Sequence, residues 1–248
     1  MQLWSIVRTK MSIYRTTYHL KNNDVNLYRR LRTSRLFEML QAACVMHTEQ
    51  LGAGRTKTLD KGLLWVVIQQ TLTVERMPEY DEEIVVETWP GNTMHVLFPR
   101  YFRVLDVKGN ILINGSALWT LIDAKTRSLV FANQYGIDVP GESHPGEAGL
   151  PKAIKTETTD THQSFKVPFS YCDLNGHMNN ARYLDLVEDA LSCAAEGRQF
   201  TSITTQYDHE IRYGETIDLS WGKHGNAYFI RGDGKKNCFR IFLQYRED

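Results

Sequence analysis

The fold and function of this chain are decided by one stretch of sequence, Tyr171-Cys-Asp-Leu-Asn-Gly-His-Met-Asn-Asn-Ala-Arg-Tyr183. Asp, Asn and Gly crowd its centre, and these residues favour the turns that precede helices. The polar set in it is typical of a reaction site: Asp173, Asn175, His177, Asn179 and Asn180. The alternative is an ordinary capping turn in which His177 is a satisfied polar group. We favour the reaction site because Asp, Asn and His stand at alternate positions and two more Asn follow.

An amphipathic helix is predicted directly after this stretch. Apolar residues recur there at three- and four-residue spacing, and acidic residues take other positions. The apolar members are Tyr183, Leu186, Val187, Ala190, Leu191 and Ala194. His177 is therefore expected near the start of the helix, where unpaired backbone N–H groups stabilise developing negative charge.

The first half of the chain repeats the same order of elements. A helix is predicted from a Thr33 or Ser34 cap to Gly52. Asp24-Val-Asn26-Leu-Tyr28 precedes it as Asp173-Leu-Asn175-Gly-His177 precedes the second helix, an offset of 149 residues from 24 to 173. Tyr28 then stands where the second copy has His177, so the first copy lacks the group that titrates near neutral pH. We infer a duplicated unit in which only the second copy kept the reactive set.

Strands rich in β-branched and aromatic residues are predicted around both helices. In the first half they are expected at 64–76, 83–89 and 101–120, the last as a hairpin around Lys108-Gly109-Asn110, with a further strand pair at 121–131. In the second half they are expected at 164–171, 202–212, 215–223, 227–231 and 238–245. Each unit therefore predicts a curved antiparallel sheet wrapped around one helix. The fold class is α+β, with an N-terminal domain at 1–131, a Gly- and Pro-rich linker at 132–160 and a C-terminal domain at 161–248.

Composition argues against several classes of function. Lys plus Arg and Asp plus Glu number 29 each, so no net field favours nucleic acid. The 4 cysteines form no CxxC pair, which argues against a zinc ribbon or a disulfide-rich secreted scaffold. No metal-ligand spacing appears, and neither a metal nor a cofactor is expected. Residues 1–18 lack the apolar core of a signal peptide, and no stretch has the length of a membrane span, so we expect a cytoplasmic protein without stable membrane insertion.

At these motifs the sequence resembles the acyl-acyl carrier protein thioesterases of plastids and bacteria, which are built from two tandem hotdog domains. The stretch from Asp173 to Tyr183 is similar to that family's Asp-x-Asn-x-His-x-Asn-Asn signature, and Gln206-Tyr-Asp-His-Glu210 resembles its Tyr-x-x-Glu segment. The first half adds similar segments at Gly62-Leu-Leu-Trp65-Val, Val86-Glu-Thr-Trp89, Ala117-Leu-Trp119 and Asp123-Ala-Lys-Thr-Arg127. The resemblance runs from about Tyr14 to Tyr245 and implies a double hotdog fold.

The resemblance also implies an activity, the hydrolysis of a fatty acyl thioester on acyl carrier protein to a free fatty acid and the carrier's thiol. Carried over by position, the catalytic set is Asp173, Asn175, His177 and Glu210. Substrate contacts are expected from Asn179, Asn180, Trp65, His47 and Arg182. The chain departs from many plant members at Ile211, where they carry a cysteine once proposed as the nucleophile.

Two parts of the substrate are expected to be recognised differently. The acyl chain needs an apolar tunnel, which in this family lies mainly in the first domain, and the candidates for lining it are Leu40, Ala43, Cys44, His47, Trp65 and Val67. Each of these is equally explained as plain core. The carrier is acidic and presents the acyl group on a phosphopantetheine arm, so a basic residue such as Arg182 would help at the mouth. The alternative for Arg182 is a helix-surface charge.

The chemistry predicts a base that activates water. A thiolate leaving group has a conjugate acid that titrates at about 8.5, so the demanding steps are deprotonating water and stabilising the oxyanion. We assign the base to Glu210, because a partly desolvated carboxylate on a strand would have a raised pKa. Asn175 and His177 would position the water or the carbonyl, and Asp173 would orient the network. The alternatives are a solvated Glu210 and a nucleophilic Cys172, although a free Cys is most often a small core residue.

There are three rival functions. An acyl-coenzyme A thioesterase would use the same chemistry, whereas a hotdog dehydratase fits the Asp-x-Asn-x-His pattern poorly. A non-catalytic acyl-binding module would have no evident use for the reactive set. Hotdog sheets often pair edge to edge, and the tandem copies satisfy this within one chain, so a homodimer is allowed but not required.

Overall fold

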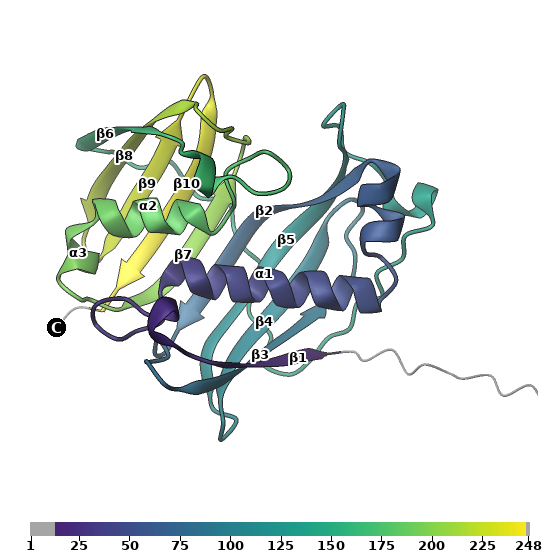
Figure 1. The fold of residues 1–248 in the computed structure, drawn as a ribbon, viewed down its shortest axis with the longest axis horizontal. Helices are drawn as coiled ribbons and strands as arrows, with labels where there is room; N and C mark the ends of the chain where they lie inside the picture. Colours follow the sequence, from purple (N-terminus) through teal and green to yellow (C-terminus); the bar gives the residue numbers. More distant parts are fainter. Residues whose placement is uncertain (1–12, 247–248) are drawn as a thin grey trace, which may run out of the picture.

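The computed structural model describes residues 13–246, in which two longer helices lie across one face of a ten-stranded antiparallel sheet (Figure 1). Most of the stretch on which the signal-peptide prediction rests, residues 1–12, lies outside the described residues. The helices are α1 (Thr33–Gln50), α2 (Arg182–Ala190) and the short α3 (Ser192–Ala195). The strands are β1 (Tyr14–His19), β2 (Leu63–Val74), β3 (Glu83–Pro90), β4 (Phe98–Asp106), β5 (Ile111–Asp123), β6 (Thr161–Lys166), β7 (Phe200–Tyr207), β8 (Thr216–His224), β9 (Ala227–Asp233) and β10 (Asn237–Tyr245).

The strand order shows the duplication directly. It runs β1-β3-β4-β5-β2 through the first half and continues as β7-β10-β9-β8-β6 through the second. The two halves are therefore related by a local twofold that passes between β2 and β7. At this junction the hydroxyls of Thr71 and Thr204 lie 2.9 Å apart, and Gln69 Nε2 donates to Gln206 Oε1 at 3.0 Å. The backbone ladder and these side-chain bonds join the halves into one continuous sheet.

Each long helix buries one apolar stripe against its own half of the sheet. Leu36, Met39, Leu40 and Ala43 of α1 are at most 1% exposed, as the spacing predicts. The helix begins with Arg32 as its N-cap, so the predicted caps Thr33 and Ser34 lie inside the first turn. No side chain of the local sequence caps it; instead Glu188 of α2 accepts hydrogen bonds from the Thr33 hydroxyl and N–H. The start of α1 is thus stabilised by the other half.

The segment 132–160 covers the opposite face of the sheet. Trp89 projects away from α1 and donates its indole N–H to Glu147 Oε1 at 2.9 Å. The Ser116 hydroxyl donates to the Gly149 carbonyl at 2.6 Å, and Arg240 Nη1 donates to the Ile154 carbonyl at 2.9 Å. The segment therefore crosses from the first half onto the second and satisfies polar groups of both.

Several local predictions are wrong. No strand pair forms at 121–131, because β5 runs on to Asp123 and the returning chain makes one isolated bridge, Ile122 to Leu129. The second helix does not continue to Ala194, since Leu191 has extended backbone angles that separate α2 from α3. Strand β7 ends at Tyr207, so Glu210 lies in the following loop rather than on a strand. None of the helices among residues 13–246 is long and apolar enough to cross a membrane.

Candidate active site

Three charged or titratable side chains meet at the junction between the two halves. His177 Nε2 lies 3.0 Å from Glu210 Oε2 and 3.0 Å from Arg127 Nη2. Arg127 Nη1 lies 3.2 Å from Glu210 Oε1, which closes the triangle. The His177 side chain is 11% exposed, and Glu210 and Arg127 are about one-third exposed, at 34% and 31%. The cluster is therefore partly desolvated but open to a small molecule on one side.

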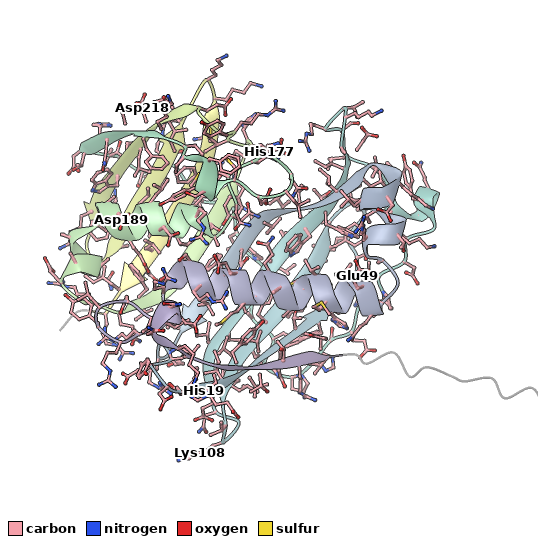
Figure 2. All side chains as sticks on the ribbon, in the orientation of Figure 1. His19, Glu49, Lys108, His177, Asp189 and Asp218 are labelled. Carbon is pink, nitrogen blue, oxygen red and sulfur yellow. The ribbon has the colours of Figure 1, made fainter. Side chains whose placement is uncertain are left out.

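A tight loop fixes the position of His177. The Asp173 N–H donates to the His177 carbonyl at 2.9 Å, and the Asp173 carboxylate accepts from the Asn175 N–H at 2.8 Å. Gly176 at the tip has φ +77°, which glycine adopts without strain. Met178 N–H then donates to the Ile211 carbonyl at 2.7 Å, which ties this loop to the one that carries Glu210. Figure 2 shows His177 on this loop, ahead of α2.

One sequence expectation about this loop, the position of the helix start, needs correction. Helix α2 begins at Arg182, five residues beyond His177, so the helix start does not lie at the imidazole. The Asp173 carboxylate accepts a hydrogen bond within its own turn, and among the described residues no hydrogen bond or ion pair joins it to His177 or Glu210. Its place in this structure is that of a turn residue that shapes the loop.

The pKa of Glu210 is shifted opposite to the sequence expectation. Burial of the carboxyl acts to raise its pKa. The hydrogen bond with His177 and the charges of His177, Arg127 and Arg212 outweigh this effect and bring the pKa of Glu210 below its ordinary value. Glu210 is accordingly an ionised carboxylate at neutral pH.

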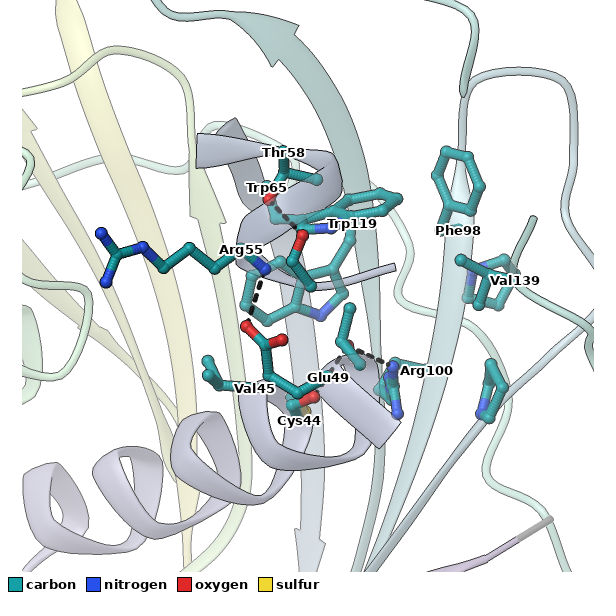
Figure 3. Close-up of a pocket in the computed structure, with 14 residues that line it drawn as sticks. Cys44, Val45, Glu49, Arg55, Thr58, Trp65, Phe98, Arg100, Trp119 and Val139 are labelled. Atoms are coloured by element: carbon teal, nitrogen blue, oxygen red, sulfur yellow. Dashed lines mark hydrogen bonds between the residues drawn. The ribbon is translucent and has the colours of Figure 1, made fainter. Parts of the chain in front are cut away.

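The four residues assigned as catalytic line one pocket. Asp173, Asn175, His177 and Glu210 share it with Asn180, with Gln41 of α1 and with strand residues of β2 and β5. Trp65 and Trp119 line this pocket and also a second, more apolar one under the C-terminal end of α1. The second pocket is drawn in Figure 3. A ligand that lies along Trp65 and Trp119 would extend from the polar pocket into the apolar one.

The tunnel candidates fall into three groups. Cys44 and Trp65 line the apolar pocket, and Val67 lines the polar one. Leu40 and Ala43 are core residues that line neither pocket. His47 is fully buried beside the apolar pocket, with its Nδ1 3.0 Å from Arg100 Nη1. Arg100, which the sequence did not single out, is the member of this pair that reaches the pocket wall.

Comparison with known proteins decides the family. The model of the acyl-ACP thioesterase N-terminal domain matches residues 11–133, and that of the C-terminal domain matches residues 154–240. This chain belongs to the acyl-ACP thioesterase family. The family recognised from the sequence motifs is thereby confirmed.

Curated relatives come from plants. A dodecanoyl-[acyl-carrier-protein] hydrolase of Cinnamomum camphora is 27% identical over 80% of this chain and 56% of its own length. A palmitoyl-acyl carrier protein thioesterase of Cuphea hookeriana is 25% identical over 91% of this chain and 60% of its own length. The chain thus spans between about half and two-thirds of the length of these relatives.

Solved structures share the fold. An acyl-ACP thioesterase from Bacteroides thetaiotaomicron superposes with a TM-score of 0.84 at 20% identity, over 95% of this chain and 98% of that one. The 12:0-ACP thioesterase from Umbellularia californica gives a TM-score of 0.79 at 22% identity, over 95% and 98%. The predicted α+β double hotdog fold is confirmed.

The internal repeat of this acyl-ACP thioesterase family member has a different register from the predicted one. Residues 26, 28 and 30 make the backbone contacts that residues 173, 175 and 177 make, an offset of 147. Arg29 has φ +64° where Gly176 has +77°, and the bridge of Arg30 to Glu79 repeats that of His177 to Arg212.

The counterpart of His177 is therefore Arg30 rather than Tyr28. Tyr28 corresponds to Asn175, and Asn26 corresponds to Asp173. The loop carrying Glu210 repeats with an offset of 133, from Glu79 to Arg212, so Met77 corresponds to Glu210. The first copy has neither a base nor an imidazole at the equivalent positions.

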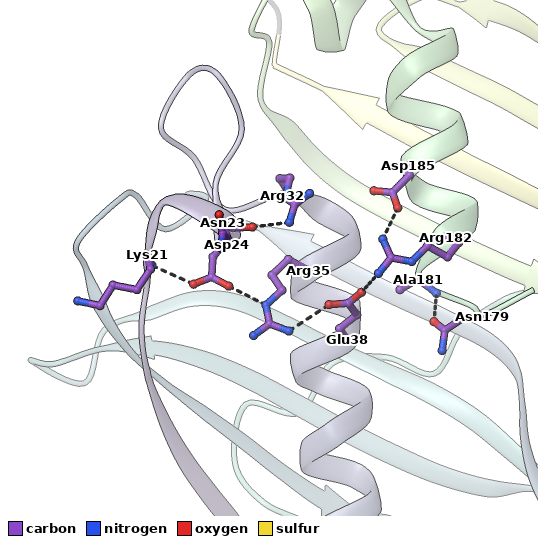
Figure 4. Close-up of polar contacts among 10 residues, drawn as sticks. All are labelled: Lys21, Asn23, Asp24, Arg32, Arg35, Glu38, Asn179, Ala181, Arg182 and Asp185. Carbon is purple, nitrogen blue, oxygen red and sulfur yellow. Dashed lines mark hydrogen bonds and ion pairs between the residues drawn. The ribbon is translucent and has the colours of Figure 1, made fainter. Parts of the chain in front are cut away.

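Arg182 and Asn179 lie outside the polar pocket. Arg182 pairs with Asp185 at 2.7 Å and with Glu38 of α1, as Figure 4 shows. The Asn179 side chain accepts from the Ala181 N–H at 2.9 Å. Both residues line a shallower pocket on the outer face of α1. Arg182 is thus committed to an ion-pair network between the two helices.

Arg127 is the site residue that sequence reasoning missed. It comes from the turn after β5 in the first half, far from the signature in the chain. Its only sequence signal was the Asp123-Ala-Lys-Thr-Arg127 segment shared with the family. Cys172 is a poor nucleophile, because burial and the neighbouring Asp173 charge raise its pKa. Among residues 13–246 no cluster of three or more His, Cys, Asp or Glu could hold a metal ion.

Proposed function

We propose that this chain hydrolyses the thioester of a fatty acyl group carried on acyl carrier protein, releasing the free fatty acid and the carrier's phosphopantetheine thiol. Family membership supports the reaction class. One geometric observation supports the site: Glu210 Oε2 lies 3.0 Å from His177 Nε2, in a pocket that shares Trp65 and Trp119 with an apolar pocket. The thioester would lie at the first pocket and the acyl chain in the second.

In the proposed reaction Glu210 takes a proton from water as the water oxygen bonds to the thioester carbonyl carbon. Because the pKa of Glu210 lies below its usual range, the carboxylate is a modest base that is always available at neutral pH. We assign His177 to orienting this carboxylate, and the amides of Asn175 and Asn180 to the carbonyl oxygen as negative charge develops. Collapse of the tetrahedral intermediate breaks the C–S bond, and the departing thiolate takes up the proton.

The direct test is incubation of the purified chain with oleoyl-acyl carrier protein while free thiol is titrated. We expect stoichiometric release of fatty acid and carrier thiol over many turnovers. Competition with oleoyl-coenzyme A measures the carrier preference as a ratio of kcat/KM values, and a preference for coenzyme A would overturn the choice of carrier. Binding of the acyl carrier protein without thiol release would overturn hydrolysis and favour an acyl-binding protein.

A further inference from the structure

We propose that Arg127, supplied by the first half, is a positioning residue that holds Glu210 and His177 of the second half in their working arrangement. The inference rests on the proposed thioester hydrolysis. The two terminal nitrogens of Arg127 contact both partners. Nη1 lies 3.2 Å from Glu210 Oε1, and Nη2 lies 3.0 Å from His177 Nε2. Nη1 is enclosed by the protein, and its contact with Glu210 is an ion pair rather than an aligned hydrogen bond.

Hydrogen bonds fix the conformation of the turn that carries Arg127. Asp123 Oδ1 accepts from the N–H groups of Lys125 at 2.9 Å and Thr126 at 2.7 Å, and the Arg127 N–H donates to the Asp123 carbonyl at 2.9 Å. The Ala124 N–H donates to the Gly62 carbonyl at 2.8 Å, which anchors the turn beside β2. Arg127 itself has φ +59°, a left-handed conformation that is strained for a non-glycine residue. A glycine would adopt this conformation without strain, whereas the arginine side chain reaches both Glu210 and His177.

The contacts at His177 Nε2 explain what Arg127 does. An arginine N–H only donates, and an ionised carboxylate only accepts. A single ring nitrogen cannot satisfy Arg127 and Glu210 at once, because one contact requires a bare nitrogen and the other an N–H. Arg127 therefore competes with Glu210 for Nε2 while attracting the same carboxylate. The positive charge of Arg127 thereby favours an ionised Glu210 beside His177.

The charged and titratable groups that act on Glu210 come from several elements. They are His177 on the signature loop, Arg127 on the turn after β5, Arg212 on the loop before β8, and Tyr183 on α2. Arg212 is exposed and its side chain forms no ion pair among the described residues. Arg127 is thus the cation that touches both members of the pair. The alternative is that Arg127 forms only an ordinary exposed ion pair. In that case its removal would have little effect.

The test compares Arg127→Gln, Arg127→Gly and the control Lys125→Gln in the chain of residues 1–248 with oleoyl-acyl carrier protein. Lys125→Gln removes one positive charge from the same turn without touching Glu210. We expect Arg127→Gln to lower kcat on the order of 100-fold, the loss typical of a displaced catalytic group, and to move the acid limb of the pH profile to higher pH. Added guanidinium ion should restore part of the activity of Arg127→Gly, and Lys125→Gln should match the wild type.

A second readout does not depend on turnover. The ¹³C shift of the Glu210 carboxyl, followed by NMR titration, should report a higher pKa in Arg127→Gln than in the wild type. Wild-type kcat and an unmoved Glu210 titration in Arg127→Gln would overturn the positioning role, as would a loss of activity without a pH shift or guanidinium rescue. A wild-type chain that releases no thiol would instead contradict the proposed function, and the carboxyl titration would still decide the role of Arg127.

Discussion

Glu210 is subject to opposing effects on its pKa. Burial acts to raise the pKa, and His177, Arg127 and Arg212 together lower it. The net lowering means that the carboxylate is ionised at neutral pH, and that His177, Arg127 and Arg212 together outweigh burial in setting its pKa. This is the opposite of a base tuned toward neutral pH by desolvation.

The lowered pKa of Glu210 predicts a pH dependence of stability. Because the folded pKa lies below the unfolded one, the stabilisation by Glu210 is fully present above its ordinary value of 4.5 and is lost as pH falls through the folded pKa. In urea unfolding, the free energy of unfolding of wild type should therefore exceed that of Glu210→Gln by a constant amount between pH 7 and about pH 5. This difference should close at lower pH. Glu83→Gln, at an exposed carboxylate without an ion pair among the described residues, serves as control. A difference in the free energy of unfolding that widens toward low pH would contradict a lowered pKa of Glu210.

At the scale of elements, hydrophobic patterning predicted the helices and most strands, because a buried stripe or an alternating strand leaves a local signature. The loops that build the site could not be predicted in this way. Asp24 and Asn26 both suit the first position of an Asx turn. Residue identity alone therefore aligns Asp24 with Asp173. Only the hydrogen bonds of the folded chain show that Asn26 takes that position.

Arg127 shows the same limit of sequence reasoning. Its contact with His177 depends on β2 and β7 lying side by side, which is a long-range pairing. In the sequence, the Asp123 turn is marked only by its resemblance to a family segment. No local pattern indicates which site such a turn will face. The end of β7 before Glu210 likewise follows from sheet pairing rather than from residue preference.

The tip of the signature loop gives a prediction at this scale. Gly176→Ala should destabilise the protein by about 1 kcal/mol, because an L-residue is strained at its φ of +77° and no atom lies within 4 Å of the added Cβ. Activity should fall as well, since the same turn positions His177. The matched control is Gly149→Ala, where the Cβ also meets nothing within 4 Å and no positive φ occurs. Equal melting temperatures for both variants would show that the loop tolerates the change without strain.

At the scale of the whole molecule, both halves contribute side chains to the candidate site. The second half supplies His177 and Glu210, and the first supplies Arg127 and the walls of the apolar pocket. The equivalent residues of the first copy, Tyr28, Arg30 and Met77, line a different pocket, and two of them bond to the second half. Tyr28 donates its hydroxyl to the Ala195 carbonyl, and Arg30 Nη1 donates to the Gly197 carbonyl at 2.6 Å. These two hydrogen bonds link the two halves at this position.

This division predicts a separation of stability from activity. Tyr28→Phe removes the hydrogen bond to Ala195 and should lower the free energy of unfolding by about 1 kcal/mol while thiol release stays at the wild-type rate. Tyr80→Phe is the control, because Tyr80 is similarly exposed and its hydroxyl makes no hydrogen bond among residues 13–246. A marked loss of turnover in Tyr28→Phe would mean that the first copy still takes part in the reaction.

The most direct measurement is the rate of thiol release from oleoyl-acyl carrier protein by wild type and Glu210→Gln. The substitution keeps the shape of the side chain and removes the base. We predict sustained release by the wild type and a loss on the order of 100-fold or more in a variant that melts cooperatively. Release by Glu210→Gln within a few-fold of wild type would contradict the assignment of Glu210 as the group that activates water.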